Sequence, residues 1–141
     1  MINIHATLID FNGKGILLTG KSGSGKSDVA LRMIMDKGAK LVGDDRVILY
    51  RDGNDILGKA PDILAKKLEI RNIGIVEIDQ FTDLVKVCLC VELSNDKDNL
   101  ERMPQNKYID ILGMNIPQIT LYPFECSTIH KIIQKISGKI I

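Results

Sequence analysis

The stretch Gly20-Lys21-Ser22-Gly23-Ser24-Gly25-Lys26-Ser27 has the spacing G-x-x-x-x-G-K-[ST] of a phosphate-binding loop. Its glycines let backbone N–H groups turn inward around phosphates, where a Cβ would obstruct them. Lys26 supplies a compact positive charge for the β- and γ-phosphates, and Ser27 supplies a hydroxyl for Mg²⁺. We therefore expect the whole stretch to bind a nucleotide.

The residues on either side have the order that such a loop requires. The apolar run Gly15–Thr19 is suited to a buried strand, and Lys26–Met35 carries apolar residues at helical spacing. The N-terminus of that helix adds partial positive charge beneath the phosphates. A glycine-rich turn that matches the spacing by chance lacks this context, so nucleotide binding is the favoured interpretation.

Length and composition predict one ordinary domain over residues 1–141, with 45% hydrophobic and 26% charged residues. The 19 basic and 18 acidic residues leave a net charge of +1, which argues against a nucleic-acid binder with a dominant basic surface. No apolar run approaches the ~20 residues of a membrane span, and no signal peptide is evident. We expect a cytoplasmic protein that binds neither nucleic acid nor membrane.

The rest of the chain predicts more strands than helices. Asn12-Gly13 predicts a hairpin turn, and an isoleucine pattern at i, i+3, i+4 and i+7 from Ile129 predicts an amphipathic helix capped by Ser127. We expect an α/β fold with a mixed sheet, a helix after the phosphate loop and a C-terminal amphipathic helix. The expected extended segments are Ile4–Phe11, Gly15–Thr19, Lys40–Gly43, Val47–Tyr50, Ile56–Ala60, Leu68–Ile78 with an interruption at Gly74, Val85–Leu93 and Ile116–Tyr122.

Three further features bear on the reaction. Asp44 and Asp45 follow a strand that can end beside the loop, where one carboxylate orients Mg²⁺ and the other accepts a proton, although a solvated turn also explains them. Glu69 and Arg71 are two apart in a predicted strand and share a face, which suits either exposure to water or a metal and a phosphate. His5 precedes the hairpin, and a lone histidine is more often structural or exposed than catalytic.

Taken in order, these segments resemble the C-terminal catalytic domain of bacterial HPr kinase/phosphorylase. His5–Gly13 resembles the family's histidine-containing strand and hairpin. Gly20–Asp28, Leu41–Val47 and Leu68–Ile75 resemble its three main motifs. The resemblance is to a short form, without the family's separate N-terminal domain, and self-association into a homo-oligomer is compatible with it.

The resemblance implies the cofactors ATP and Mg²⁺ and transfer of the γ-phosphoryl group to a serine of HPr, a phosphotransferase-system carrier protein. Reverse phosphorolysis is the implied companion activity. Asp44 resembles the family's proton-transferring aspartate, His5 a histidine near it, and Arg71 an active-site arginine. The residues that resemble the metal environment are Ser27, Asp45 and Glu69.

Departures from the family leave alternatives open. Asn72 stands where the family has a glycine, and the segment between Ile78 and Val85 is too short for a flexible glycine-containing loop. Arg102 aligns only loosely with a further phosphate-side arginine. A non-catalytic ATP-binding module derived from the kinase, or a P-loop kinase with a different acceptor, are the alternatives within this fold.

A small GTPase or ATPase switch is the remaining alternative. The pattern D-x-x-G occurs at Asp10–Gly13, Asp55–Gly58 and Asp110–Gly113. The first precedes the phosphate loop and is better interpreted as a turn. No N-K-x-D guanine motif follows the other two, which argues against GTP.

Overall fold

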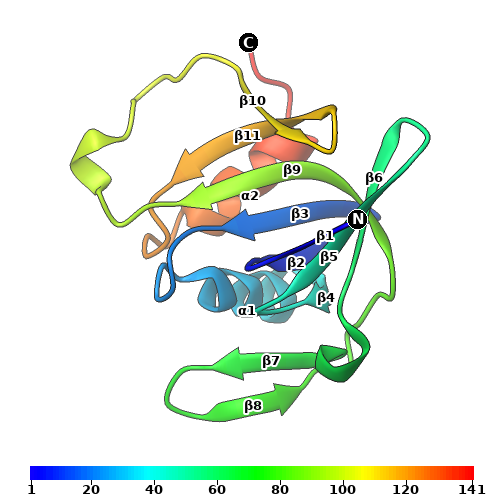
Figure 1. Cartoon of the computed structure of the whole chain (residues 1–141). Helices are drawn as coiled ribbons and strands as arrows, with labels where there is room; N and C mark the ends of the chain where they lie inside the picture. Colours follow the sequence, from blue (N-terminus) through cyan, green and yellow to red (C-terminus); the bar gives the residue numbers. More distant parts are fainter.

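The computed structural model describes residues 1–141, which form a curled mixed sheet and two α-helices (Figure 1). The sheet has the strand order β1-β5-β6-β9-β3-β2-β4, with β11 joined to β9 and β10 to β11. Strands β7 and β8 form a separate two-stranded sheet. The bounds are β1 Ile2–Ile4, β2 Thr7–Phe11, β3 Lys14–Thr19, α1 Lys26–Lys37, β4 Lys40–Gly43, β5 Val47–Asp52, β6 Asp55–Lys59, β7 Lys67–Ile70, β8 Gly74–Glu77, β9 Val85–Leu93, β10 Lys107–Ile111, β11 Met114–Leu121 and α2 Thr128–Ser137.

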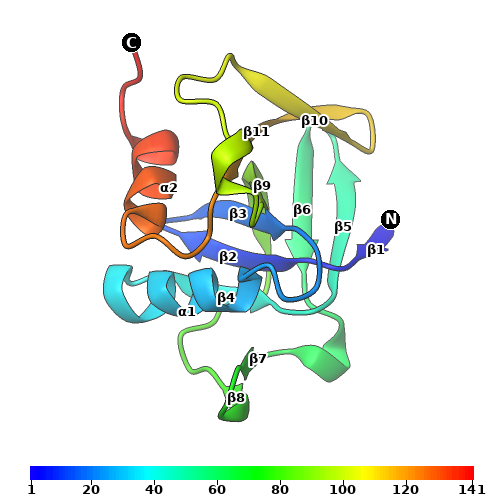
Figure 2. The same ribbon diagram turned by 90° about the vertical axis from the view of Figure 1, so that its left-hand side faces the viewer.

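The centre of the sheet is buried on both faces. A cluster of 17 buried residues lies between the sheet and the two helices, and a cluster of 12 lies on the opposite face toward β5, β6 and the β10–β11 hairpin (Figure 2). Successive residues of a strand point to opposite faces, so Leu8 belongs to the second cluster and Ile9 to the first. This packing fixes the end of β3, from which the phosphate loop emerges.

The strand, loop and helix predicted around residues 20–27 are present. β3 pairs in parallel with β9 and antiparallel with β2, and the loop leads directly into α1. Gly38 ends α1 in the left-handed conformation, with φ 72° and its N–H donating to the Met33 carbonyl. Neither helix has the length and apolar character needed to cross a membrane.

Helix α2 carries the predicted isoleucine face, but its cap differs from the prediction. Ser127 occupies the N-cap position without a capping hydrogen bond from its side chain. The neighbouring Thr128 instead donates its hydroxyl to the Tyr122 carbonyl at 2.7 Å and accepts from the Glu125 N–H. This second contact ties the loop before α2 to the helix itself.

Two predicted strands are divided. Ile4–Phe11 breaks at His5 because β1 pairs with β5, whereas β2 lies between β3 and β4, and one straight strand cannot do both. Leu68–Ile78 is the β7–β8 hairpin, so Arg71 lies in its turn and not on a strand beside Glu69. Strand β10 was not predicted; it pairs with β11.

Candidate active site

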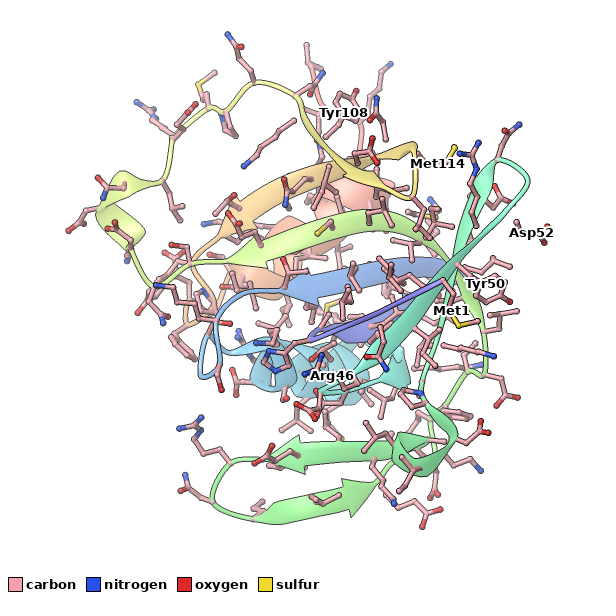
Figure 3. The ribbon with its side chains drawn as sticks, in the orientation of Figure 1. Met1, Arg46, Tyr50, Asp52, Tyr108 and Met114 are labelled. Atoms are coloured by element: carbon pink, nitrogen blue, oxygen red, sulfur yellow. The ribbon has the colours of Figure 1, made fainter.

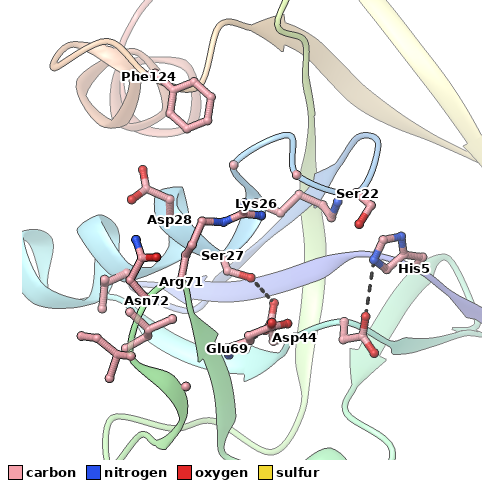
Figure 4. Close-up of a pocket in the computed structure, with 17 residues that line it drawn as sticks. His5, Ser22, Lys26, Ser27, Asp28, Asp44, Glu69, Arg71, Asn72 and Phe124 are labelled. Atoms are coloured by element: carbon pink, nitrogen blue, oxygen red, sulfur yellow. Dashed lines mark hydrogen bonds and ion pairs between the residues drawn. The ribbon is translucent and has the colours of Figure 1, made fainter.

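A cavity of about 680 Å³ lies between the phosphate loop, the end of β4 and the β7–β8 hairpin (Figure 4). Most of the predicted site residues line it: His5, Ser22, Gly23, Gly25, Lys26, Ser27, Asp44, Asp45, Glu69 and Arg71. Gly20, Lys21 and Ser24 face a second hollow on the other side of the loop. Arg102 lines neither hollow, so the loose alignment of that residue with a phosphate-side arginine finds no support in the geometry.

The loop has the backbone conformation that its glycines permit. Gly20, Gly23 and Gly25 all have positive φ, at 144°, 79° and 93°. A Cβ on Gly20 would lie 2.5 Å from Ser24 Oγ and 2.8 Å from the Leu93 carbonyl oxygen, so only glycine fits there. No side chain caps the N-terminus of α1, which leaves the N–H groups of its first turn available to an anion.

Lys26 is 7% exposed and is held under the loop. Its Nζ donates to the carbonyl oxygens of Gly20 at 3.0 Å and of Lys21 at 2.9 Å. Burial lowers the pKa of Lys26 below its usual value, while the charges of Asp44 and Asp45 act in the opposite direction. An ammonium group with so little water around it is well placed to gain from a phosphate.

Asp44 is the most constrained carboxylate of the cavity, at 5% exposure. Its Oδ1 accepts hydrogen bonds from Thr7 Oγ1 at 2.8 Å and Ser27 Oγ at 2.9 Å. Its Oδ2 accepts from the Glu69 N–H at 3.1 Å. The carboxylate is thereby fixed to β2, to the phosphate loop and to the β7–β8 hairpin at once.

Asp45 has a different environment from its neighbour. It has positive φ, 71°, and its side chain is 62% exposed. His5 Nε2 lies 3.4 Å from Asp45 Oδ1, so the histidine pairs with the second aspartate of the pair (Figure 4). The bend between β1 and β2 places His5 at this point, because the chain turns from one part of the sheet to another there.

Arg71 extends from the turn of the β7–β8 hairpin toward the phosphate loop (Figure 4). Its Nη2 lies 3.9 Å from the position that a Cβ on Gly23 would occupy. Arg71 forms no ion pair in the structure. The guanidinium group is therefore available to a phosphate bound in the loop.

The residues fit a Mg²⁺ ion that arrives with a nucleotide. No group of His, Cys, Asp and Glu side chains forms a ready cage for a metal ion. Mg²⁺ usually binds through one or two carboxylates together with substrate phosphates and water, so no such cage is needed. The Ser27 hydroxyl and the carboxylates of Asp44, Asp45 and Glu69 line the same cavity and supply suitable oxygen ligands.

Sequence reasoning missed two residues of the site, one of them fully buried and one on the cavity lining. Thr7 reaches Asp44 from β2, and Phe124 lines the cavity from the loop between β11 and α2. An alternating strand pattern hints at which face Thr7 occupies but not at its partner. Phe124 is separated from the phosphate loop by about a hundred residues of sequence, and no local pattern marks it.

The D-x-x-G patterns belong to secondary structure and not to a switch region. The Gly13 N–H donates to Asp10 Oδ1 at 2.7 Å in the β2–β3 turn, which confirms the predicted turn. The Gly113 N–H donates to Asp110 Oδ1 at 2.9 Å in the β10–β11 turn. The third pattern, Asp55–Gly58, lies within β6. Each pattern has a structural explanation that needs no GTP.

Comparison with known proteins gives a consistent result. Residues 1–140 match the family described as HPr Serine kinase C-terminal domain. The chain is 35% identical over 127 residues to an HPr kinase/phosphorylase of Clostridium botulinum and 38% identical over 130 residues to one of Lactobacillus delbrueckii subsp. bulgaricus. Both alignments cover 84% of this chain and, respectively, 41% and 40% of the relative, so the chain spans less than half the length of these relatives.

A solved structure is similar over nearly the whole chain. The Hpr(Ser) kinase/phosphatase from Coxiella burnetii superposes with a TM-score of 0.80 and 26% sequence identity. The match covers 96% of this chain and 97% of the solved one. The curled mixed sheet and its two helices are thus an architecture already seen in a protein of that description.

Proposed function

The chain belongs to the HPr serine kinase C-terminal domain family, and from this premise we propose that it is an ATP-dependent protein-serine kinase acting on HPr. The observation that carries the proposal is the position of Asp44. Its buried carboxylate lies 2.9 Å from the hydroxyl of Ser27, the residue of the phosphate loop that approaches the terminal phosphates. A base for an incoming hydroxyl must lie at this end of the nucleotide.

In the proposed reaction, the serine Oγ of HPr attacks the γ-phosphorus of ATP and its proton passes to the Asp44 carboxylate. The bond between the γ-phosphorus and the β–γ bridging oxygen breaks, and ADP leaves. Lys26, from the phosphate loop, and Arg71, from the β7–β8 hairpin, stabilise the charge on the transferred group. In the reverse phosphorolysis inorganic phosphate attacks the phosphorus of phosphoserine, the bond from that phosphorus to the serine Oγ breaks, Asp44 returns the proton to the serine oxygen, and pyrophosphate leaves.

We assign Mg²⁺ to Ser27, Asp45 and Glu69, which line the cavity around Asp44. The ion neutralises charge on the β- and γ-phosphates when it is bound. His5 holds Asp45 in place through the contact at 3.4 Å. The hydrogen bond from the Glu69 N–H orients Asp44, so a single strand supplies a metal ligand and a positioning contact.

The test is to incubate the protein with Mg²⁺, [γ-³²P]ATP and HPr and to follow label on serine. We expect wild type to label HPr and Asp44→Asn to lose at least about a hundredfold in rate while its affinity for ATP stays within about threefold. Asp52→Asn is the matched control, because Asp52 lies at the β5–β6 turn away from the cavity (Figure 3). An Asp44→Asn variant that labels HPr at the wild-type rate would contradict the role of Asp44.

A second candidate, a nucleotide-binding module without transfer, is favoured by one observation. Where we expected the family's flexible loop, the segment after Ile78 is short and runs along β4, with the Leu41 N–H donating to the Gln80 carbonyl and the Thr82 N–H to the Leu41 carbonyl. Binding of ATP without any labelling of HPr would select this candidate. It would leave the assignment of the phosphate loop intact.

A further inference from the structure

The two ends of the cavity differ in chemistry. His5, Asp44 and Asp45 gather at one end, where the transfer is proposed to occur. Phe124 lies on the side away from His5, with Asp28 and Asn72 nearer to it than the histidine is (Figure 4). The hydrophobic residues of the lining are Leu31, Ile70, Ile73 and Phe124. A phosphate site alone has no use for apolar side chains.

Phe124 rests directly on the phosphate loop. Its Cε1 and Cζ lie 3.1 and 3.2 Å from the position that a Cβ on Gly25 would occupy. The side chain is nevertheless 52% exposed, and its ring meets Tyr122 edge to face with the centroids 5.8 Å apart. The ring is thus supported on one side and open on another, next to the first turn of α1.

The loop that carries Phe124 is anchored by charge. Arg32, on α1, donates to the carbonyl oxygens of Pro123 and Glu125, the latter at 3.1 Å. The Glu125 carboxylate pairs with Lys131 at 3.1 Å and with Lys97 at 3.4 Å. Because these contacts hold the residues on both sides of Phe124, the aromatic ring is positioned before any ligand arrives.

A nucleotide bound in the loop extends away from the end at which its terminal phosphate lies. Its terminal phosphate faces Lys26, Ser27 and Asp44, so its nucleoside must lie toward the opposite end of the cavity. The exposed face of Phe124 is there, and so is Ile73, which is 75% exposed at the turn of the β7–β8 hairpin. The apolar faces of a flat aromatic base pack favourably against side chains of this kind.

We propose that the base of the bound nucleotide stacks on Phe124, with Leu31 and Ile73 at its edges. This inference rests on the proposed binding of ATP in the loop but not on the identity of the acceptor. Stacking does not choose between bases, since every base has a π-face. Asn72, the only side-chain amide of the cavity lining, lies at the same end and offers a donor and an acceptor to the edge of the base (Figure 4).

The test compares ATP with inorganic tripolyphosphate, which has the phosphates but no nucleoside. We expect calorimetry to show that Phe124→Ala weakens the binding of Mg²⁺–ATP by about 5- to 150-fold, which is the range for loss of a base–aromatic stack. The affinity of the variant for tripolyphosphate should stay within about twofold of the wild-type value. Tyr108→Ala is the matched control, because Tyr108 is 57% exposed on the β10–β11 hairpin, far from the cavity (Figure 3). It should change neither affinity.

A second variant reports on the contact directly. The chain contains no tryptophan, so Phe124→Trp introduces a single fluorophore. We expect ATP to change its emission and tripolyphosphate to leave it nearly unchanged, while ATP affinity stays within about threefold of wild type. Equal losses for the two ligands in Phe124→Ala, or no loss for either, would overturn the proposal.

The outcome is separable from that of the proposed kinase activity. If the wild-type protein binds ATP but does not label HPr, HPr is rejected as the acceptor. The comparison of ATP with tripolyphosphate is still valid in that case. If the wild-type protein binds neither ATP nor tripolyphosphate, both the phosphate-site assignment and the stacking proposal are rejected.

Discussion

The floor of the cavity and the hairpin that walls it are built in contrasting ways. The floor is the phosphate loop with Lys26 and Asp44, which are 7% and 5% exposed and which make hydrogen bonds to several elements. The wall is the β7–β8 hairpin, a separate two-stranded sheet whose Ile73 and Ile75 are 75% and 72% exposed. A two-stranded hairpin has marginal stability by itself in water, so this one depends on Leu68, which is buried in the core with α1.

The difference separates two tasks. The floor must hold the phosphates in one geometry, and its buried polar contacts make it rigid. The hairpin carries Glu69 and Arg71 over the same cavity, and it is joined to the rest of the molecule by Leu68 in the core with α1 and by the hydrogen bond from the Glu69 N–H to Asp44.

The largest effect is expected from Lys26→Met, which removes the charge of the floor and keeps the length of the side chain. Loss of a buried charge that pairs with phosphate costs about 2–5 kcal/mol, so the affinity for ATP should fall by at least about thirtyfold in calorimetry. Unchanged affinity would contradict the assignment of residues 20–27 as the phosphate loop.

The same variant should unfold no more easily than wild type. Burial lowers the pKa of Lys26 below its usual 10.5 in the folded protein, so its charged form is disfavoured by folding. The free-energy cost of burying the charged Lys26 is fully present below the folded-state pKa. It is relieved as the pH rises from that pKa toward 10.5. Urea unfolding should therefore show the stability advantage of Lys26→Met at pH 7 and a smaller one near pH 10.

The next largest effect is expected from Leu68→Ala, which should destabilise the β7–β8 hairpin and lower the free energy of unfolding. Leu68 is fully buried in the core shared with α1, and truncation of a buried leucine costs about 2–5 kcal/mol. Ile75→Ala is the matched control on the facing strand, and because Ile75 is exposed it should change the free energy of unfolding by no more than about 0.5 kcal/mol. Similar values for the two variants would mean that the hairpin is not anchored through Leu68.

The contrast between floor and wall also explains what could be predicted from sequence. The phosphate loop is a local motif: its glycine spacing, the strand before it and the helix after it all lie within about twenty-five residues. The two helices and the Asn12-Gly13 turn are local as well, and the structure contains them. Local patterns were sufficient for these elements because their conformation depends on neighbours along the chain.

The parts that were not predicted depend on distant partners. The break at His5 arises because β1 pairs with β5 while β2 pairs with β3 and β4. Arg71 is an exception, because the β7–β8 hairpin that places it in a turn is local, and its turn residues Asn72 and Gly74 both have positive φ. Phe124 meets Gly25 only when β11 and β3 have each found a place beside β9. Sheet pairing of this kind is not encoded in any window of sequence.

The smallest effect is expected in the loop before α2, which is exposed like the hairpin but held by polar contacts like the floor. The hydrogen bond from Lys131 is the main cause that lowers the pKa of Glu125 below its usual 4.5, with Lys97 adding to it. A carboxyl with a lowered folded-state pKa adds stability above pH 4.5 and loses it as the pH falls through the folded-state value. Glu125→Gln should lower Tm by at most about 3 °C at pH 7 and should match wild type near pH 2.

The control for this variant is Glu101→Gln, since Glu101 is exposed and forms no ion pair. Differential scanning calorimetry at pH 7 and pH 2 separates the two variants. If these charges hold the loop, Glu125→Gln should also lower the affinity for ATP slightly and leave the affinity for tripolyphosphate unchanged. The reason is that the loop positions Phe124 and does not touch the phosphates. A loss of tripolyphosphate binding in Glu125→Gln would show instead that the loop before α2 supports the floor itself, and the separation of the nucleoside end from the phosphate end would not hold.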